Sequence, residues 1–430
     1  MRATTWRVLV AGGWIACASI TASAQTAWPP SIAVFEPAVS ESPVPAVLPA
    51  DVTVRPPDPA LVPAKARFSG LWQGWACPGA QCDVRIAVEQ VGEREATVVY
   101  AGANASQGLI TDRAVGEFEG GELRLRLRTG ARLLLRLREG SGDMEMSLWR
   151  PDTQLLSFGV LTQKPLKPTY TRRVERVPTP WTEDGRQQTL EMVVYQPLTP
   201  GPYPTLIFNH GSTGTGDKPE WFRLTWTAPE VVRYFVNKGW QVLFAQRRGR
   251  GQSDGLYDEG FEPDRSRYAC RPELTIPGLD RAVADLDVVM THVRARDDVN
   301  LQRMLVGGVS RGGILSVAYA GAHPDWFRGV VNFVGGWVGD RCADADEVNP
   351  VIFKRGAAFP QPTLWLYGEK DPFYALRHSR RNFEAFIGAG GRGTFESYSP
   401  PPGLDGHSIY LDRSLWAHAM DRYLAQIAAP

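Results

Sequence analysis

The chain after residue 170 alternates short, continuous apolar runs with helical patterns. Each run is apolar at consecutive positions, so both of its faces must be buried, as in a parallel sheet that is covered on both sides. The stretches between the runs are amphipathic and have the period of helices that cover such a sheet. This alternation predicts a doubly wound, mostly parallel α/β domain over residues 170–430. The runs are residues 205–208, 242–245, 304–306, 330–333 and 363–367, and the helical patterns are residues 230–237, 279–294, 313–322, 374–386 and 413–427.

A different pattern occupies residues 68–165, where apolar and polar side chains alternate. In residues 123–128 leucine alternates with arginine, which gives a strand with one apolar and one charged face. About seven such strands predict a small antiparallel β-barrel or sandwich. Gly70-Leu71-Trp72 is similar to the G-x-W signature of lipocalin-like barrels. The arginine face, or Trp72 and Trp75, would be the contacts of a ligand- or glycan-binding module, but solvated arginines and core tryptophans are the commoner roles.

The first 24 residues have the features of a secretory signal. Two arginines precede an apolar run, and Ala22-Ser23-Ala24 provides the small side chains that a signal peptidase accepts. The run is shorter than the roughly 20 residues that span a bilayer, which disfavours a membrane anchor. Lipid attachment at Cys17 is a lesser alternative. We expect cleavage near Ala24 and a secreted or periplasmic protein, in which the proline-rich residues 25–67 form an extended or disordered linker.

Four cysteines remain after removal of such a signal, namely Cys77, Cys82, Cys270 and Cys342. An even number of cysteines in an oxidising compartment predicts disulfides. Cys77 and Cys82 enclose the turn-forming pair Pro78-Gly79, so a local bridge is the simplest pairing and leaves Cys270 for Cys342. Free buried thiols are the alternative. No Cys/His spacing is typical of a zinc site, and we expect no metal or organic cofactor.

The charge balance argues against two classes of partner. Lys and Arg total 47 and Asp and Glu total 46, which gives a formal net charge of +1. Such a chain lacks the excess positive charge whose electrostatic field would attract a phosphate backbone or an anionic bilayer. We therefore expect neither nucleic-acid binding nor a membrane span. The length of 430 residues favours two domains, and the oligomeric state cannot be read from the sequence.

Gly308-Val309-Ser310-Arg311-Gly312 fits the G-x-S-x-G pattern of a nucleophile elbow. It directly follows the buried run at residues 304–306 and directly precedes a helical pattern, which is the context that this motif requires. The strand-to-helix turn is so tight that the residues two before and two after the serine must lack bulk. Ser310 is therefore the predicted nucleophile.

A serine nucleophile of this kind works with an acid and a base as a catalytic triad. Candidates for both follow Ser310 in the chain order that the triad needs. Asp371 comes directly after the buried run at residues 363–367, and the following proline keeps it at the end of that strand. His407 lies in a loop just before the last helical pattern. Glu369 and Asp405 are the competing carboxylates. We predict that Asp371 orients His407 and that His407 activates Ser310.

A tetrahedral oxyanion also requires two amide donors. The amide that follows the nucleophile, that of Arg311, is the first. The run at residues 205–208 leads into a His-Gly turn, where the amide of Ser212 is the preferred second donor and that of Gly211 the fallback. His210 in this turn is expected to hold the loop by hydrogen bonds rather than to act as a base.

Together these residues resemble the α/β-hydrolase superfamily, and within it the dienelactone-hydrolase-like and X-prolyl-peptidase-like esterase branches. The resemblance covers residues 170–430, and residues 248–255 are similar to the R-G-x-G-x-S-x-G loop of that branch, where the loop shapes the active-site rim. The branch commonly places an aspartate where this chain has Gln246. Dienelactone hydrolases use a cysteine nucleophile where this chain has Ser310.

The expected function is hydrolysis of a small carboxylic ester through an acyl-enzyme on Ser310. The segment 256–275 is expected to line the pocket. A serine peptidase of the same fold is the first alternative, and a non-catalytic binding protein with a relic hydrolase domain is the second. The expected walls of the pocket are Tyr257, Phe261, Trp337 and Phe373.

Overall fold

The fold was analysed in a computed structural model of the chain. It describes residues 7–10, 13–15, 36–77, 82–105, 107–151, 155–401 and 404–428. The described chain divides into two compact units, and the main boundary between them along the sequence lies between Pro168 and Thr169. No helix among the described residues is long and apolar enough to cross a bilayer.

The predicted signal lies mostly outside the described residues. Its described parts are two short strands, β1 (Arg7–Val10) and β2 (Gly13–Ile15), and β1 pairs with a strand of the first unit. Cys17, the cleavage site near Ala24 and the first part of the predicted linker are outside the described residues.

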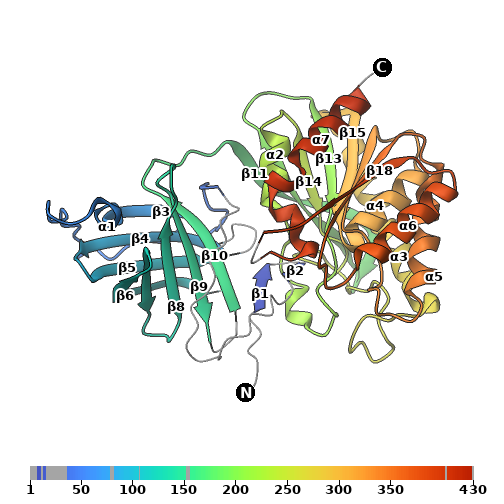
Figure 1. The fold of residues 1–430 in the computed structure, drawn as a ribbon. Helices are drawn as coiled ribbons and strands as arrows, with labels where there is room; N and C mark the ends of the chain where they lie inside the picture. Colours follow the sequence, from blue (N-terminus) through green and yellow to red (C-terminus); the bar gives the residue numbers. More distant parts are fainter. Residues whose placement is uncertain are drawn as a thin grey trace. The chain divides into compact units, whose positions relative to one another are not determined.

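The first unit is a closed barrel of eight antiparallel strands (Figure 1). Each strand pairs with the next along the chain, and the last strand, β10, pairs with both β9 and β3, which closes the barrel. The sequence predicted either a barrel or a sandwich, and the structure shows a barrel. The strands are β3 (Gly70–Ala76), β4 (Cys82–Val91), β5 (Glu95–Asn104), β6 (Gly108–Glu119), β7 (Glu122–Arg126), β8 (Arg132–Leu137), β9 (Met144–Arg150) and β10 (Leu155–Thr162).

Alternating side chains fill the barrel as the pattern predicts. Leu123 and Leu125 are buried in the core, whereas Arg126 is exposed. Trp72 belongs to the same core and donates its indole N–H to the carbonyl of Phe68 at 2.9 Å. The tryptophan of the G-x-W signature therefore has a packing role.

The described part of the proline-rich segment, residues 36–62, is extended and bonded to the first unit. Ala46 packs against Ala101 and Ala103, and its amide donates to Asp83 at 2.8 Å. The segment leads into the short helix α1 (Pro63–Ala66). These residues therefore pack on the barrel and contribute to its surface.

The second unit is built on an eight-stranded sheet in the order β11-β12-β14-β13-β15-β16-β17-β18. The first two strands pair antiparallel, and β12 is also antiparallel to β14, whereas the remaining strands are parallel. The five predicted buried runs form the centre. The sequence missed β11, β12 and β18, of which β11 and β18 are half exposed, whereas β12 is buried from Leu190 to its end. The strands are β11 (Tyr170–Glu183), β12 (Arg186–Pro197), β13 (Tyr203–Asn209), β14 (Gln241–Ala245), β15 (Val299–Val309), β16 (Gly329–Phe333), β17 (Thr363–Gly368) and β18 (Gly393–Tyr398).

Helices cover both faces of this sheet, so the predicted fold class is confirmed (Figure 1). The first and last helices, α2 and α7, pack together, and α3, α4, α5 and α6 pack with one another. The sequence missed α5 and expected α3 to start later than it does. The helices are α2 (Pro229–Val236), α3 (Pro272–Arg294), α4 (Arg311–Ala322), α5 (Ala345–Arg355), α6 (Leu376–Gly388) and α7 (Arg413–Ala428), with 3-10 turns η2 (Pro219–Trp221), η3 (Gly356–Ala358) and η4 (Gly406–Leu411).

Candidate active site

Ser310 occupies a strained turn between β15 and α4. Its φ of 57° and ψ of −124° lie in a region that a side chain rarely adopts. A Cβ on Gly308 would overlap the backbone of Gly312, and one on Gly312 would overlap the carbonyl of Asn209. The two glycines of the motif are therefore required by close backbone approach. The turn lifts the serine to the carboxyl end of the sheet, where α/β sites open.

Asp371 and His407 form a hydrogen-bonded pair. Asp371 Oδ2 accepts from His407 Nδ1 at 2.9 Å, and its Oδ1 accepts from the amides of Phe373 and Tyr374 at 2.7 and 3.1 Å. These three bonds hold the carboxylate in one orientation. Gly406 allows the approach, because a Cβ there would overlap the backbone just before Asp371.

The competing carboxylates differ from Asp371 in their contacts. Glu369 accepts a hydrogen bond from Ser399 Oγ at 2.6 Å on the exposed side of its loop. Asp405 acts on His407 through its charge, whereas Asp371 also bonds to the imidazole directly.

The environment of His407 favours a proton on the imidazole. Burial opposes the charged form, but the charge and hydrogen bond of Asp371, together with the charge of Asp405, outweigh it and raise the pKa of His407 above its ordinary value of 6.5. The bond from Nδ1 to Asp371 leaves Nε2 as the atom that can accept a proton.

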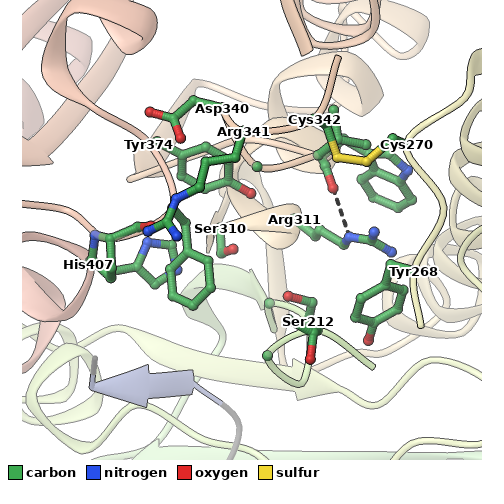
Figure 2. A pocket seen from close by; sticks show the side chains of 18 of the residues that line it. Ser212, Tyr268, Cys270, Ser310, Arg311, Asp340, Arg341, Cys342, Tyr374 and His407 are labelled. Carbon is green, nitrogen blue, oxygen red and sulfur yellow. Dashed lines mark hydrogen bonds between the residues drawn. A yellow bond between two sulfur atoms is a disulfide. The ribbon is translucent and has the colours of Figure 1, made fainter. Parts of the chain in front are cut away.

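Ser310 and His407 line the same pocket, although they are 97 residues apart in the sequence (Figure 2). Figure 2 shows Ser310 between His407 on one side and Arg311 on the other. Tyr374 lies beside both, since its hydroxyl donates to the carbonyl of Gly336 at 2.7 Å and is within hydrogen-bonding reach of Ser310.

The predicted oxyanion donors lie around Ser310. Arg311 is the first residue of α4, where backbone amides have no partner within the helix. Gly211 is so close that a Cβ there would lie 3.0 Å from Ser310 Cβ. Ser212 lines the same pocket and lies below Ser310 in the view of Figure 2. Gly211 and Ser212 therefore both lie at the pocket beside Ser310.

His210 holds this turn. Its Nδ1 lies 2.8 Å from the carbonyl oxygen of Gly211, and its Nε2 accepts the amide N–H of Arg247 at 3.2 Å. These partners require a proton on Nδ1 and none on Nε2. Burial, assisted by the charges of Arg247 and Arg250, lowers the pKa of His210 well below its ordinary value. A neutral, fully engaged imidazole cannot serve as the base for Ser310.

The pocket has a volume of about 480 Å³, within the range for small-molecule sites. Trp337 and Phe373 line it, as the sequence analysis expected. Tyr257 and Phe261 were also expected to line the pocket. They are not among the described residues that line it. Both are buried behind Tyr268, which lines the pocket and contacts their rings.

A disulfide fastens two loops at this pocket. Cys270 in the segment before α3 is bonded to Cys342 in the loop after β16, and both residues line the pocket (Figure 2). The other pair, Cys77 with Cys82, lies in the first unit. Among the described residues, no group of three or more His, Cys, Asp or Glu side chains could hold a metal ion.

Sequence reasoning missed three side chains that build the site. Tyr374 follows Asp371 closely in the sequence. This position could have indicated that it lies near the serine. Tyr268 and Glu259 lie in the segment that was expected to line the pocket, but neither belongs to a motif. Their roles depend on hydrogen bonds to distant residues, which a single sequence does not reveal.

Part of the second unit matches a known protein family. Residues 225–339 match the Hydrolase_4 family, described as serine aminopeptidase, S33. The matched segment includes Ser310 and ends before Asp371 and His407.

Solved structures align with parts of the chain at low identity. A putative dienelactone hydrolase from Klebsiella pneumoniae subsp. pneumoniae MGH 78578 is 18% identical, with a TM-score of 0.38, over 60% of this chain and 100% of its own. Est1E from Butyrivibrio proteoclasticus with bound ferulic acid is 16% identical, with a TM-score of 0.41, over 59% and 99%. A putative dipeptidyl aminopeptidase IV from Bacteroides ovatus ATCC 8483 is 14% identical, with a TM-score of 0.43, over 80% and 48%.

Proposed function

We propose that the second unit, a serine hydrolase domain of the α/β-hydrolase fold, cleaves carboxylic esters through Ser310, His407 and Asp371. The observation that carries the proposal is the convergence of a strained serine with a carboxylate-oriented histidine on one pocket. In this arrangement the three residues can take the roles of nucleophile, base and acid in a catalytic triad.

The proposed reaction starts with proton transfer. His407 Nε2 takes the proton of Ser310 Oγ as the oxygen attacks the ester carbonyl carbon. The amide of Arg311 and that of Ser212 or Gly211 donate to the resulting oxyanion. His407 then returns the proton to the departing alcohol, which leaves an acyl-enzyme.

Water completes the cycle by the same route. His407 removes a proton from a water molecule that attacks the acyl carbon, the second tetrahedral intermediate collapses, and Ser310 recovers its proton. Asp371 keeps the imidazole in the required tautomer and stabilises its charged form without itself taking the proton.

A labelling experiment tests the nucleophile directly. A fluorophosphonate probe should bond covalently to the wild-type protein, and peptide mapping should place the adduct on Ser310. The Ser310→Ala variant should remain unlabelled and should lose hydrolysis of p-nitrophenyl acetate. Equal labelling of that variant would reject the assignment.

An aminopeptidase is the second candidate, and the matched family description favours it. Glu262 and Asp340 line the pocket and could attract a substrate ammonium group. Both carboxylates are already engaged, since Glu262 pairs with Arg271 at 3.2 Å and Asp340 accepts the amide of Ala375 at 2.8 Å. We therefore expect p-nitrophenyl esters to be cleaved faster than aminoacyl-p-nitroanilides, and the reverse order would favour the peptidase.

We also propose that the protein works outside the cytosol, because disulfides persist in oxidising compartments. Support comes from the two bridges of the structure. A peptide map of the native protein, alkylated without reductant, should find Cys77, Cys82, Cys270 and Cys342 unmodified. Alkylation of any of them would contradict the proposal.

A further inference from the structure

Glu259 is a buried carboxylate that the proposed reaction does not use. It lies in the segment between β14 and α3, and only 2% of its surface is exposed. A charge in this position is costly unless several donors satisfy it. Three chains of contacts start from Glu259, and each ends at a backbone segment that carries an oxyanion donor.

The first chain leads to the nucleophile elbow. Arg311 Nη1 lies 3.6 Å from Glu259 Oε2 and donates to the carbonyl oxygen of Glu259 at 2.7 Å. The same guanidinium donates from Nε to the carbonyl of Trp337 at 2.8 Å and lies 3.9 Å from the ring centroid of Tyr268. The side chain of Arg311 is thus fixed on all sides, and its own backbone amide is the first oxyanion donor.

The second chain leads to the start of the His-Gly turn. Arg247 Nε forms a short ion pair with Glu259 Oε1, and Nη2 of the same guanidinium donates to the carbonyl oxygen of His210 at 3.0 Å. That carbonyl belongs to the peptide unit whose N–H is the amide of Gly211. A charged donor on the carbonyl both orients this peptide and polarises its N–H.

The third chain leads to the end of the same turn. Tyr257 donates its hydroxyl proton to Glu259 Oε2 at 2.8 Å, and Tyr268 donates to the Tyr257 hydroxyl at 3.0 Å. The Tyr268 oxygen accepts the amide of Thr213 at 3.2 Å. Glu259 is therefore connected to both sides of the Gly211–Ser212 pair.

We propose that Glu259 is a positioning residue that fixes the two oxyanion donors relative to each other, one on the elbow and one on the His-Gly turn. The inference rests on the proposed function. One carboxylate reaches both donor segments, so a change in its charge should move the donors without touching substrate. Burial raises the pKa of Glu259, but the neighbouring charges of Arg247 and Arg311 outweigh it and hold the pKa below its ordinary value.

Arg248, which follows Arg247 in the sequence, forms an ion pair that offers a matched control. Arg248 forms a short ion pair with Asp285 on α3, and its amide donates to the same carboxylate at 2.9 Å. Asp285 is also only 2% exposed. This pair ties the same loop to a helix and makes no contact with His210 or Arg311 among the bonds of the described residues. The two pairs have similar burial and differ in whether they reach the oxyanion donors.

The test compares Glu259→Gln with Asp285→Asn in the full chain. For Glu259→Gln we expect kcat for p-nitrophenyl acetate to fall about 10- to 100-fold with KM within about twofold, because donor misplacement weakens only the transition state. Binding of a phenylboronic acid, which forms a tetrahedral adduct on a nucleophilic serine, should weaken in parallel. Asp285→Asn should keep kcat within about threefold of the wild type.

Each outcome has a defined meaning. Equal losses of kcat in both variants, or an unchanged kcat and boronate affinity in Glu259→Gln beside an active wild type, would overturn the positioning role alone. A wild type that neither turns over esters nor labels at Ser310 would overturn the proposed function and this inference with it. Circular dichroism checks that each variant is folded.

A second variant keeps the inference testable if Glu259→Gln does not fold. Tyr268→Phe removes only the hydroxyl that links Tyr257 to the amide of Thr213. We expect it to fold and to lower kcat about 3- to 10-fold, with a proportional loss of boronate affinity. Unchanged kcat in a folded Tyr268→Phe would count against the proposal.

Discussion

Two groups of arginine–carboxylate pairs, one in the barrel and one in the hydrolase domain, differ in how far they are buried. In the barrel, Arg113 and Arg128 pair with carboxylates while 40% and 79% of their side-chain surfaces stay exposed. In the hydrolase domain, the side chains of Arg247, Arg311 and Glu259 are each 3% exposed. Solvent screens the first kind of pair, whereas the second kind is strong and costly to break. The more deeply buried of these two groups of ion pairs lies beside the proposed active site.

Strained backbone is also found beside the proposed active site. In the described part of the barrel, positive φ angles fall on glycines such as Gly120 and Gly130 and also on Cys77, which has a φ of 66°. In the hydrolase domain, Ser310, Val334 and Lys370 adopt φ angles of 57°, 42° and 58° just beyond the ends of β15, β16 and β17. Non-glycine residues in such conformations cost on the order of 1–3 kcal/mol each and persist only where the surrounding structure imposes them. Here they lie beside the proposed nucleophile and acid.

The largest expected effect comes from the carboxylate that orients His407. Asp371→Asn should lower kcat about 1,000- to 10,000-fold, because an amide cannot keep the imidazole in the required tautomer. Glu369→Gln, two residues earlier, is the control and should stay within about threefold of the wild type, since its carboxylate bonds to Ser399. Steady-state hydrolysis of p-nitrophenyl acetate measures both, and similar losses would show that the loop, rather than Asp371, is what matters.

The next effect contrasts a glycine of the elbow with one of the barrel. Gly312→Ala should lower the free energy of unfolding by roughly 3 to 5 kcal/mol, because the new methyl group overlaps the carbonyl of Asn209. Gly120→Ala, which has a φ of 58° and no atom within 4 Å of the new Cβ, should cost only about 1 kcal/mol. Urea unfolding followed by tryptophan fluorescence measures the difference. Equal costs would mean that the elbow has room to relax.

The pH profile is a smaller effect that tests the electrostatics of the site. His407 must be neutral to act as a base, so kcat/KM should rise with pH, with a midpoint above 6.5 because Asp371 and Asp405 outweigh burial. In Asp371→Asn the burial remains and the main opposing charge is lost, so the midpoint should move to lower pH. A midpoint that does not move in this variant would contradict the assigned cause.

The smallest effect is expected on the charged face of the barrel. Arg126→Ala removes an exposed side chain and should change the free energy of unfolding by less than about 0.5 kcal/mol and leave kcat unchanged. Arg247→Ala, by contrast, removes the closest charged partner of the buried Glu259 and should destabilise the protein by about 3 to 5 kcal/mol. A large effect of Arg126→Ala would indicate that the barrel face has a function of its own.

Local patterns in the sequence determined the two-part architecture and selected the candidate residues of the site. Continuous apolar runs predicted the five central strands β13 to β17, because burial on both faces leaves a signal within each strand. Ser310, Asp371 and His407 could be selected because each lies at a strand end or loop that the fold requires, in the required chain order. The glycines at positions 308 and 312 could also be explained from the sequence, because the tight turn at Ser310 requires residues without bulk.

Only the tertiary structure decided how these segments meet. The edge strands β11 and β18 are half exposed, so their patterns resemble loops, and the closure of the barrel through β10 and β3 is a pairing between strands that lie far apart in the sequence. The role of Glu259 depends on contacts with Arg247, which lies 12 residues earlier in the same segment, and with Arg311, which is the first residue of α4. Such contacts depend on three-dimensional proximity, and spacing along one chain does not encode them in a readable form.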